Sequence, residues 1–208
     1  NVESIGILFN VSSGVALKLT CEVFTLTTDS QNAFLALTGS GSDNNTTETT
    51  CQARINSAMS FKNMFIYISA NSRTTNTTFT LNDDFLATAL DLVVAGGTTG
   101  IVEETATTVT PASGSDMNWN LLTGASGGSL TVQNIAVETT NASNEFCLPS
   151  STAPGGDTIA FGTTRYLFPA AGLGNRVSET SAMVRSNITF TWKKAGVRVS
   201  AFSLNSGA

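Results

Sequence analysis

The stretch that decides the fold is SFKNMFIYISANS at residues 60–72, because a related stretch, TWKKAGVRVSAFS, follows at residues 191–203. Both belong to longer segments, 34–77 and 165–208, that align without a gap at an offset of 131. Ten of the 44 aligned positions are identical, and the apolar positions keep step: Leu37 with Phe168, Phe61 with Trp192, Ile66 with Val197, and Ile68 with Val199. We interpret this alignment as a duplicated β-module.

The composition favours an all-β protein. Charged residues are 12% of the 208-residue chain, while Ser and Thr, whose hydroxyls suit turns and strands, are abundant. The apolar share of 41% is spread along the chain and disfavours disorder. Short alternating segments separated by turn residues predict a sandwich or jelly roll, and no stretch has a helical period.

The expected organisation has four parts. Residues 33–140 form a complete module, with strands expected at Phe34–Leu37, Cys51–Ile55, Met59–Ala70, Thr77–Leu81, Ala89–Val94, Thr99–Val109, Met117–Leu122 and Leu130–Val137. Residues 141–163 read as a linker, and residues 164–208 repeat only the first half of the module. Residues 1–32 supply two alternating strands, one of which puts Leu17, Leu19, Cys21, Val23 and Thr25 on one face.

A half-sandwich would leave strand edges and a core open, so we expect residues 1–32 to complete residues 164–208. The residues assigned to this role are Ile5, Ile7, Phe9 and Val11 in the completing strand and Trp192, Val197 and Val199 in the accepting half-module. Three arrangements stay open. The strand could close the module of its own chain, it could be donated head-to-tail to a neighbouring subunit, or the chain could be one period of a longer tandem protein.

Residues 76–138 resemble a module found in phage and environmental bacterial surface proteins. The resemblance rests on Ala95–Glu103 (AGGTTGIVE), Gly114-Ser115-Asp116 and Gly127–Val132 (GGSLTV), which are mostly glycine turns between strands. The resemblance implies β-sandwich units of fibres, appendages or coats, and it carries no catalytic residue. The chain departs from the pattern at Asp83, where such modules often have an Asn-Gly turn.

Enzymatic chemistry finds little support. The chain has no histidine, which excludes Ser-His-Asp and Cys-His catalysis, and the spacing of its three cysteines matches no zinc motif that a histidine could complete. Glu103-Glu104 and Asp83-Asp84 are adjacent pairs whose members point to opposite faces of a strand, so we interpret them as solvated carboxylates. A weak calcium site at the turn of residues 82–84 is the alternative considered, but we assign no metal, cofactor or catalytic residue.

Cysteines and sequons add two expectations about the environment of the chain. Cys21, Cys51 and Cys147 allow at most one intramolecular disulfide, and buried thiols are the simpler interpretation. Acceptor triplets for N-glycosylation occur at Asn10, Asn44, Asn45, Asn76, Asn141 and Asn187, about as many as chance gives in such a Ser/Thr-rich chain. Asn44, Asn45 and Asn141 fall in expected loops and are the better candidates.

These observations together predict a non-enzymatic structural subunit of a filament, fibre or coat, extracellular or on a virion, whose partners are copies of itself. The net charge of −5 argues against nucleic acid, and no apolar run is long enough for a membrane span. The alternative is a carbohydrate-binding adhesin that uses loops 39–47 and 123–128 and aromatic residues. Tyr67, Trp119, Tyr166 and Trp192 could stack on sugars, although each lies in an expected strand, where packing is the commoner role.

Overall fold

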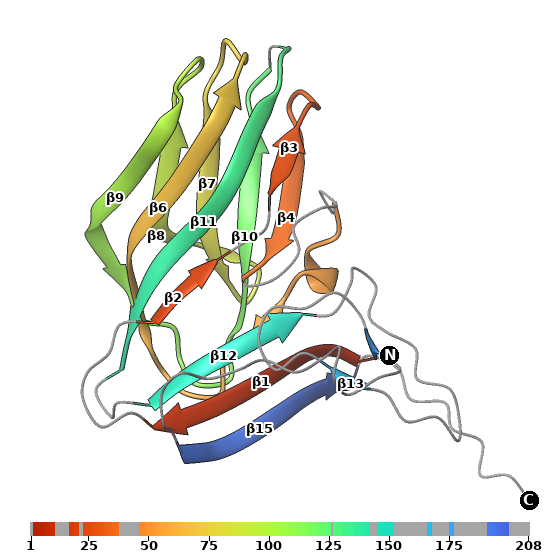
Figure 1. Ribbon diagram of the computed structural model, residues 1–208, viewed down its shortest axis with the longest axis vertical. Coiled ribbons are helices and arrows are strands. Elements are labelled where there is room, and N and C mark those ends of the chain that lie inside the picture. Colours follow the sequence, from red (N-terminus) through yellow and green to blue (C-terminus); the bar gives the residue numbers. More distant parts are fainter. Residues whose placement is uncertain are drawn as a thin grey trace, which may run out of the picture.

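The computed structural model describes residues 2–10, 17–20, 23–37, 46–125, 127–141, 145–151, 166–167, 175–176 and 191–199. These ranges are nearly all β, with one turn of 3₁₀ helix, η1 (Glu48–Thr50), as their helical element. Two antiparallel five-stranded sheets pack face to face as a sandwich, and a separate three-stranded sheet lies beyond one end of it (Figure 1). The predicted all-β sandwich class is therefore confirmed.

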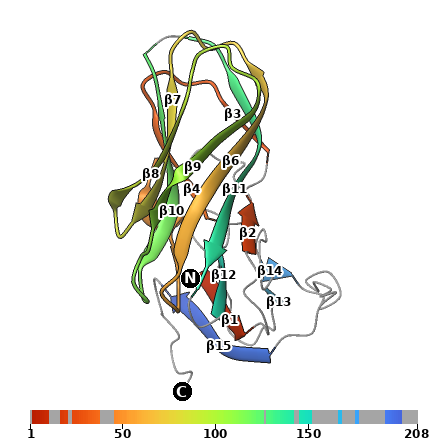
Figure 2. The ribbon, with the colours of Figure 1, turned by 90° about the vertical axis from the view of Figure 1, so that its left-hand side faces the viewer.

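Sheet I has the strand order β4-β10-β7-β8, with β5 also paired to β10. Its strands are β4 (Asn32–Ala36), β5 (Ala53–Arg54), β7 (Thr77–Asp83), β8 (Leu86–Val94) and β10 (Asp116–Thr123). Sheet II has the order β2-β11-β6-β9, with β3 also paired to β11. Its strands are β2 (Leu17–Thr20), β3 (Phe24–Leu26), β6 (Ser60–Asn71), β9 (Gly100–Val109) and β11 (Leu130–Thr140). Figure 2 shows the two layers from the side.

The core lies between sheets I and II and follows the period-two pattern of the strands. Met64, Ile66 and Ile68 of β6 are buried, whereas Tyr67 between them is exposed. On sheet I, Trp119 and its neighbours Met117 and Leu121 face the same core and have no exposed surface. β6 is a central strand of sheet II, because it pairs with both β11 and β9.

The N-terminal strands of the sandwich correct one expectation. β2 and β3 both pair with β11 in sheet II, so residues 17–20 and 24–26 belong to the sandwich rather than to residues 164–208. The predicted facing is also wrong for the second of these strands, because Phe24 and Leu26 are buried and Val23 and Thr25 are exposed.

A bulge in β11 accounts for this change of facing. β11 carries an extra residue, Gln133, so its buried positions shift from Leu130 and Val132 to Ile135 and Val137. β3 pairs with Leu130–Val132, on the near side of this bulge, so a strict alternation from residue 17 cannot anticipate which of its residues are buried.

Sheet III consists of β12 (Glu145–Ser151), β1 (Val2–Asn10) and β15 (Thr191–Val199), in that order and antiparallel. Part of the predicted linker 141–163 is therefore a strand. β12 contains Pro149, which suggested a linker, but an edge strand tolerates proline because one of its sides needs no backbone donors. Two short strands, β13 (Tyr166–Leu167) and β14 (Asn175–Arg176), pair with each other.

Candidate functional site

The N-terminal strand β1 is the feature on which our functional argument depends. It lies in the middle of sheet III and pairs along its length with both β12 and β15 (Figure 1). Its Ile5 lies opposite Val197 and its Phe9 opposite Trp192, while Val2 lies opposite Val199. The structure therefore places Ile5 and Phe9 opposite predicted accepting residues of the same chain, whereas Ile7 lies opposite Ala195 and Val11 lies outside the described residues.

The pairing of β1 with β15 reproduces the pairing of β11 with β6. In the internal repeat β15 aligns with β6, since Thr191 is the counterpart of Ser60. Ile5 opposite Val197 matches Ile135 opposite Ile66, and Ile7 opposite Ala195 matches Val137 opposite Met64. The counterparts in β1 and β11 are offset by 130 residues, and one pair, at Leu8, departs from the correspondence.

The irregularities of the two pairs coincide as well. In β11 the register skips Gln133, between Val132 and Asn134. In β1 it skips Glu3, between Val2 and Ser4. Register is set by hydrophobic pattern and bulges together, so a shared bulge position indicates that β1 occupies the place of β11 in a second copy of this sheet.

β12 extends the correspondence to a third strand. Pro149 lies opposite Gly6, as Thr20 of β2 lies opposite Ala136 of β11. The order β12-β1-β15 is therefore the order β2-β11-β6, with the same directions. β12 was not predicted, because its alternating apolar positions are only Phe146 and Leu148, and Pro149 follows them directly.

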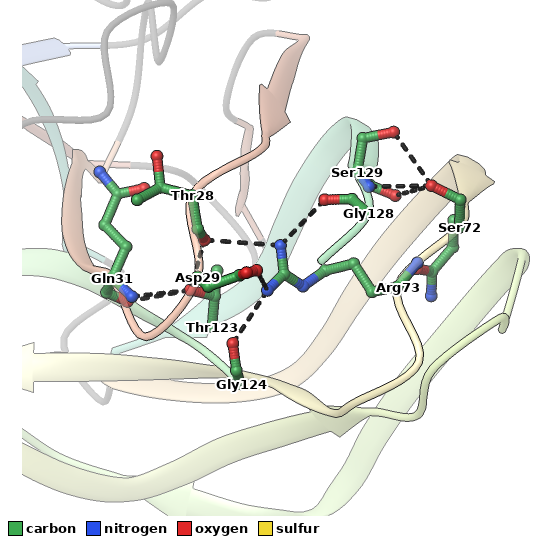
Figure 3. A network of polar contacts seen from close by, with 10 residues as sticks. Thr28, Asp29, Gln31, Ser72, Arg73, Thr123, Gly124, Gly128 and Ser129 are labelled. Atoms are coloured by element: carbon green, nitrogen blue, oxygen red, sulfur yellow. Dashed lines mark hydrogen bonds and ion pairs between the residues drawn. The ribbon is translucent and has the colours of Figure 1, made fainter. Parts of the chain in front are cut away.

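A second notable feature is a buried cation at the loop end of the sandwich (Figure 3). The side chain of Arg73, between β6 and β7, is 1% exposed, and its Nη2 lies 2.9 Å from Asp29 Oδ1. Nη2 also donates to the Gly124 carbonyl at 2.9 Å, and Nη1 donates to the carbonyls of Gly128 at 3.2 Å and Thr28 at 3.5 Å. Arg73 therefore joins three loops that are far apart in the sequence.

Glycines make room for this arrangement. Gly128 has φ +113, and a Cβ there would lie 2.5 Å from the Ser72 carbonyl oxygen. Gly96 has no space for a Cβ either, which would lie 2.6 Å from the Thr74 carbonyl carbon. The glycine turns that carry the resemblance thus allow close packing around the Arg73 loop. Arg73 itself could not be predicted as a buried residue, because in the sequence it is a lone basic residue in a polar loop.

In each of the carboxylate pairs Asp83-Asp84 and Glu103-Glu104, one carboxylate accepts hydrogen bonds from the backbone. Asp84 Oδ1 accepts a hydrogen bond from the Asp116 N–H at 2.9 Å, and the carboxylate of Asp116 binds Arg54 through two bonds of 2.8–2.9 Å. The hydrogen bond and charge of Asp116 raise the pKa of Arg54 above its usual value. Glu104 Oε1 accepts from the N–H groups of Ala106 and Thr107 within β9. The described residues contain no cluster of three or more His, Cys, Asp or Glu side chains that could hold a metal.

The aromatic residues considered for sugar stacking differ in their exposure. Trp119 is completely buried, in agreement with the packing role expected of a strand residue, whereas Tyr67 is 45% exposed on the outer face of sheet II. Ile101, which is 67% exposed, lies opposite Tyr67 on β9. The side chains of Tyr166 and Trp192 lie outside the description.

Few of the sequons and cysteines can be placed. Asn76 is exposed between β6 and β7, and Asn10 ends β1. Asn141 is half-buried, and its Nδ2, where a glycan would be attached, donates to Ser57 Oγ at 3.0 Å and to the Ala58 carbonyl. Asn44, Asn45, Asn187 and Cys21 lie outside the described residues, and Cys147 is placed only as a position in β12. Cys51 is buried and its thiol donates to the Phe34 carbonyl at 3.3 Å, as expected for a packed thiol.

These features define an all-β sandwich protein with an additional sheet built around its N-terminal strand. No family of known proteins, no curated protein and no solved structure matches the chain significantly. Within the described ranges, no helix is long and apolar enough to cross a membrane.

Proposed function

We propose that the chain is a non-enzymatic structural subunit that assembles with copies of itself, outside a cell or on a virion, by head-to-tail complementation of β-strands. The observation that carries the proposal is the register of β1, which repeats beside β15 the position that β11 holds beside β6. A strand that fills a slot of this kind can fill the same slot in another copy of the chain with the same backbone bonds.

The scarcity of charge and the lack of histidine support a structural role rather than catalysis. Such a role also suits the buried hydrogen-bonded Arg73, because it ties the loops of the sandwich together at one end. A jelly-roll form for the two modules remains part of this proposal, as does the resemblance to surface-fibre modules.

Removal of residues 1–12 tests the proposal. We expect the intact chain to form oligomers or fibres in light scattering and negative-stain electron microscopy, and the shortened chain to be monomeric while keeping the far-ultraviolet signature of a β-protein. A synthetic peptide of residues 1–12 should bind the shortened chain, whereas a peptide of the same composition in scrambled order should not. Assembly that persists without residues 1–12, or an intact chain that stays monomeric at high concentration, would rule the proposal out.

A carbohydrate-binding adhesin remains the second candidate, and the exposure of Tyr67 favours it. The ring lies between Ile101 of β9 and Asn134 of β11 in register, so an aromatic surface and an amide are neighbours on one face. Aromatic faces with adjacent polar groups suit sugar rings. Binding of the monomeric protein to a glycan array that is lost in Tyr67→Ala but kept in Ile101→Ala would support this function, and no binding by the parent protein would exclude it.

A further inference from the structure

The outer face of sheet I carries a buried polar patch that the proposed function does not use. Residues 46–52, which include η1, connect to this face through Glu48, and Cys51 is bonded to the Phe34 carbonyl of β4. Asn82 of β7 and Asn118 of β10 lie directly opposite each other in register, and they are 2% and 0% exposed. Opposite residues of this kind have Cβ atoms about 5 Å apart.

Both asparagines have an amide oxygen without a hydrogen-bond partner among the described residues. Asn118 donates its Nδ2 to the Trp119 carbonyl at 3.3 Å, and Asn82 donates its Nδ2 to Glu48 Oε1 at 2.7 Å, but neither Oδ1 accepts a bond. Buried polar atoms in native proteins nearly always have a partner, so two such oxygens on directly opposite residues indicate that a ligand or ordered water binds at this patch.

The charge around this patch favours a cation. Glu48 adds a carboxylate, and it takes part in none of the ion pairs found among the described residues. The nearest carboxylate along β10, Asp116, is already neutralised by Arg54. The carboxylate of Glu48 thus lies beside Asn82, the register partner of Asn118, and no ion pair among the described residues neutralises it.

We propose that Glu48, Asn82 and Asn118 form a low-affinity calcium site. Calcium binds carboxylate and amide oxygens in flexible geometries and completes its shell with water, whereas magnesium demands a compact octahedron. When calcium binds, the Asn82 amide turns by half a rotation, so that its oxygen faces Glu48. The hydrogen bond from Asn82 Nδ2 to Glu48 Oε1 is then replaced by bonds of both oxygens to the ion. With a single charged ligand, the affinity falls in the range of extracellular calcium modules, with a dissociation constant of about 10⁻³ M.

Thermal unfolding of the intact chain in increasing CaCl₂ tests the site. We expect the midpoint to rise by about 3 °C at 10 mM CaCl₂ and to respond much less to MgCl₂. Glu48→Gln and Asn118→Leu should each lose the calcium response. Asp91→Asn is the matched control, because it removes one carboxylate from an exposed position of the same sheet and should keep the response in full.

Asn118→Asp provides a test that does not depend on loss of function. A second carboxylate in the site should tighten calcium binding at least tenfold in calorimetry. An unresponsive parent protein, an equal response in Glu48→Gln and Asp91→Asn, or unchanged affinity in Asn118→Asp would each overturn the proposal and leave ordered water as the occupant. None of these outcomes depends on assembly, so the site can fail without the proposed function failing.

Discussion

Arg73 and Asp29 form an ion pair of 2.9 Å in which the cation is buried and the anion is 43% exposed. The two partners therefore stabilise the fold unequally. Arg73 has backbone carbonyls as additional acceptors, while Asp29 can be hydrated when its partner changes. The arginine is thus the centre of the network, and the aspartate is one of several groups that hold it.

This asymmetry gives a first prediction. Arg73→Met should lower the free energy of unfolding by about 3 kcal/mol, because the loop carbonyls lose a charged donor in a buried setting. Asp29→Asn should cost about 1 kcal/mol, since an amide oxygen can still accept from Nη2. Urea titration of both variants measures the difference, and a larger loss for Asp29→Asn would show that the ion pair, rather than the carbonyl set, dominates.

Two glycines of the same sandwich end should respond very differently to alanine. Gly97 has φ +77 and no atom within 4 Å of a Cβ, so Gly97→Ala should cost about 1 kcal/mol from backbone strain alone. Gly128→Ala combines φ +113 with a close approach to the Ser72 carbonyl and should cost about 3 kcal/mol. Thermal unfolding of the two variants measures the two losses of stability. Equal losses in Gly97→Ala and Gly128→Ala would contradict the steric argument.

The turn between β7 and β8 offers a stabilising change. Asp84 and Phe85 have φ values of 48 and 71, as in the type I′ hairpin turn that prefers glycine at its second position. Phe85→Gly should therefore stabilise the protein by about 1 kcal/mol, because a bulky residue is strained there and the ring is largely exposed. The control Leu86→Gly, just inside β8, should destabilise the protein by about 0.5–1 kcal/mol.

The burial of Trp119 predicts a loss of stability and no direct role in recognition. Trp119→Ala should cost about 3–5 kcal/mol, and Trp119→Phe much less, because the indole N–H has no hydrogen-bond partner among the described residues. Chemical denaturation measures both. If Trp119→Phe abolished binding to any glycan while leaving stability unchanged, the packing interpretation would be contradicted.

A disulfide across sheet III distinguishes closure within one chain from exchange between chains. Ile7 and Ala195 lie opposite each other in register, so the double variant Ile7→Cys/Ala195→Cys, made with Cys21 and Cys147 replaced by alanine, should cross-link on oxidation. The proposed assembly predicts a ladder of linked subunits in non-reducing electrophoresis. A monomer linked only to itself would mean that β1 closes its own chain, and the out-of-register pair Ile7→Cys/Arg198→Cys should not link at all.

Much of the sandwich could be predicted from the sequence, since long strands such as β6 and β11 keep a period of two on each side of their bulges. The eight strands expected between residues 33 and 140 all occur, with ends shifted by a few residues. β12 could not be recognised, because Pro149 breaks its pattern, and the facing of β3 depended on a bulge in another strand. Local alternation carries no information about such distant bulges.

Neither the Arg73 network nor the pair Asn82 and Asn118 was predicted, because each of these residues is a common polar residue in a polar chain. Their significance comes from burial, and burial depends on which loop covers which face. Asn82 and Asn118 become neighbours only through the pairing of β7 with β10, which sequence spacing does not reveal. The internal repeat, in contrast, pointed directly to β15, because its residues align with β6 without a gap.

The skipped residue Glu3 bears on how accurately β1 keeps its register against β15. A strand with a bulge at a fixed position pairs with its neighbours in one register only. A shift by a single residue would move the bulge away from its place and turn every side chain to the opposite face of the sheet. Exchange between subunits would then join them at one constant spacing, so that repeat length along a fibre would be encoded by one unpaired residue near the beginning of β1.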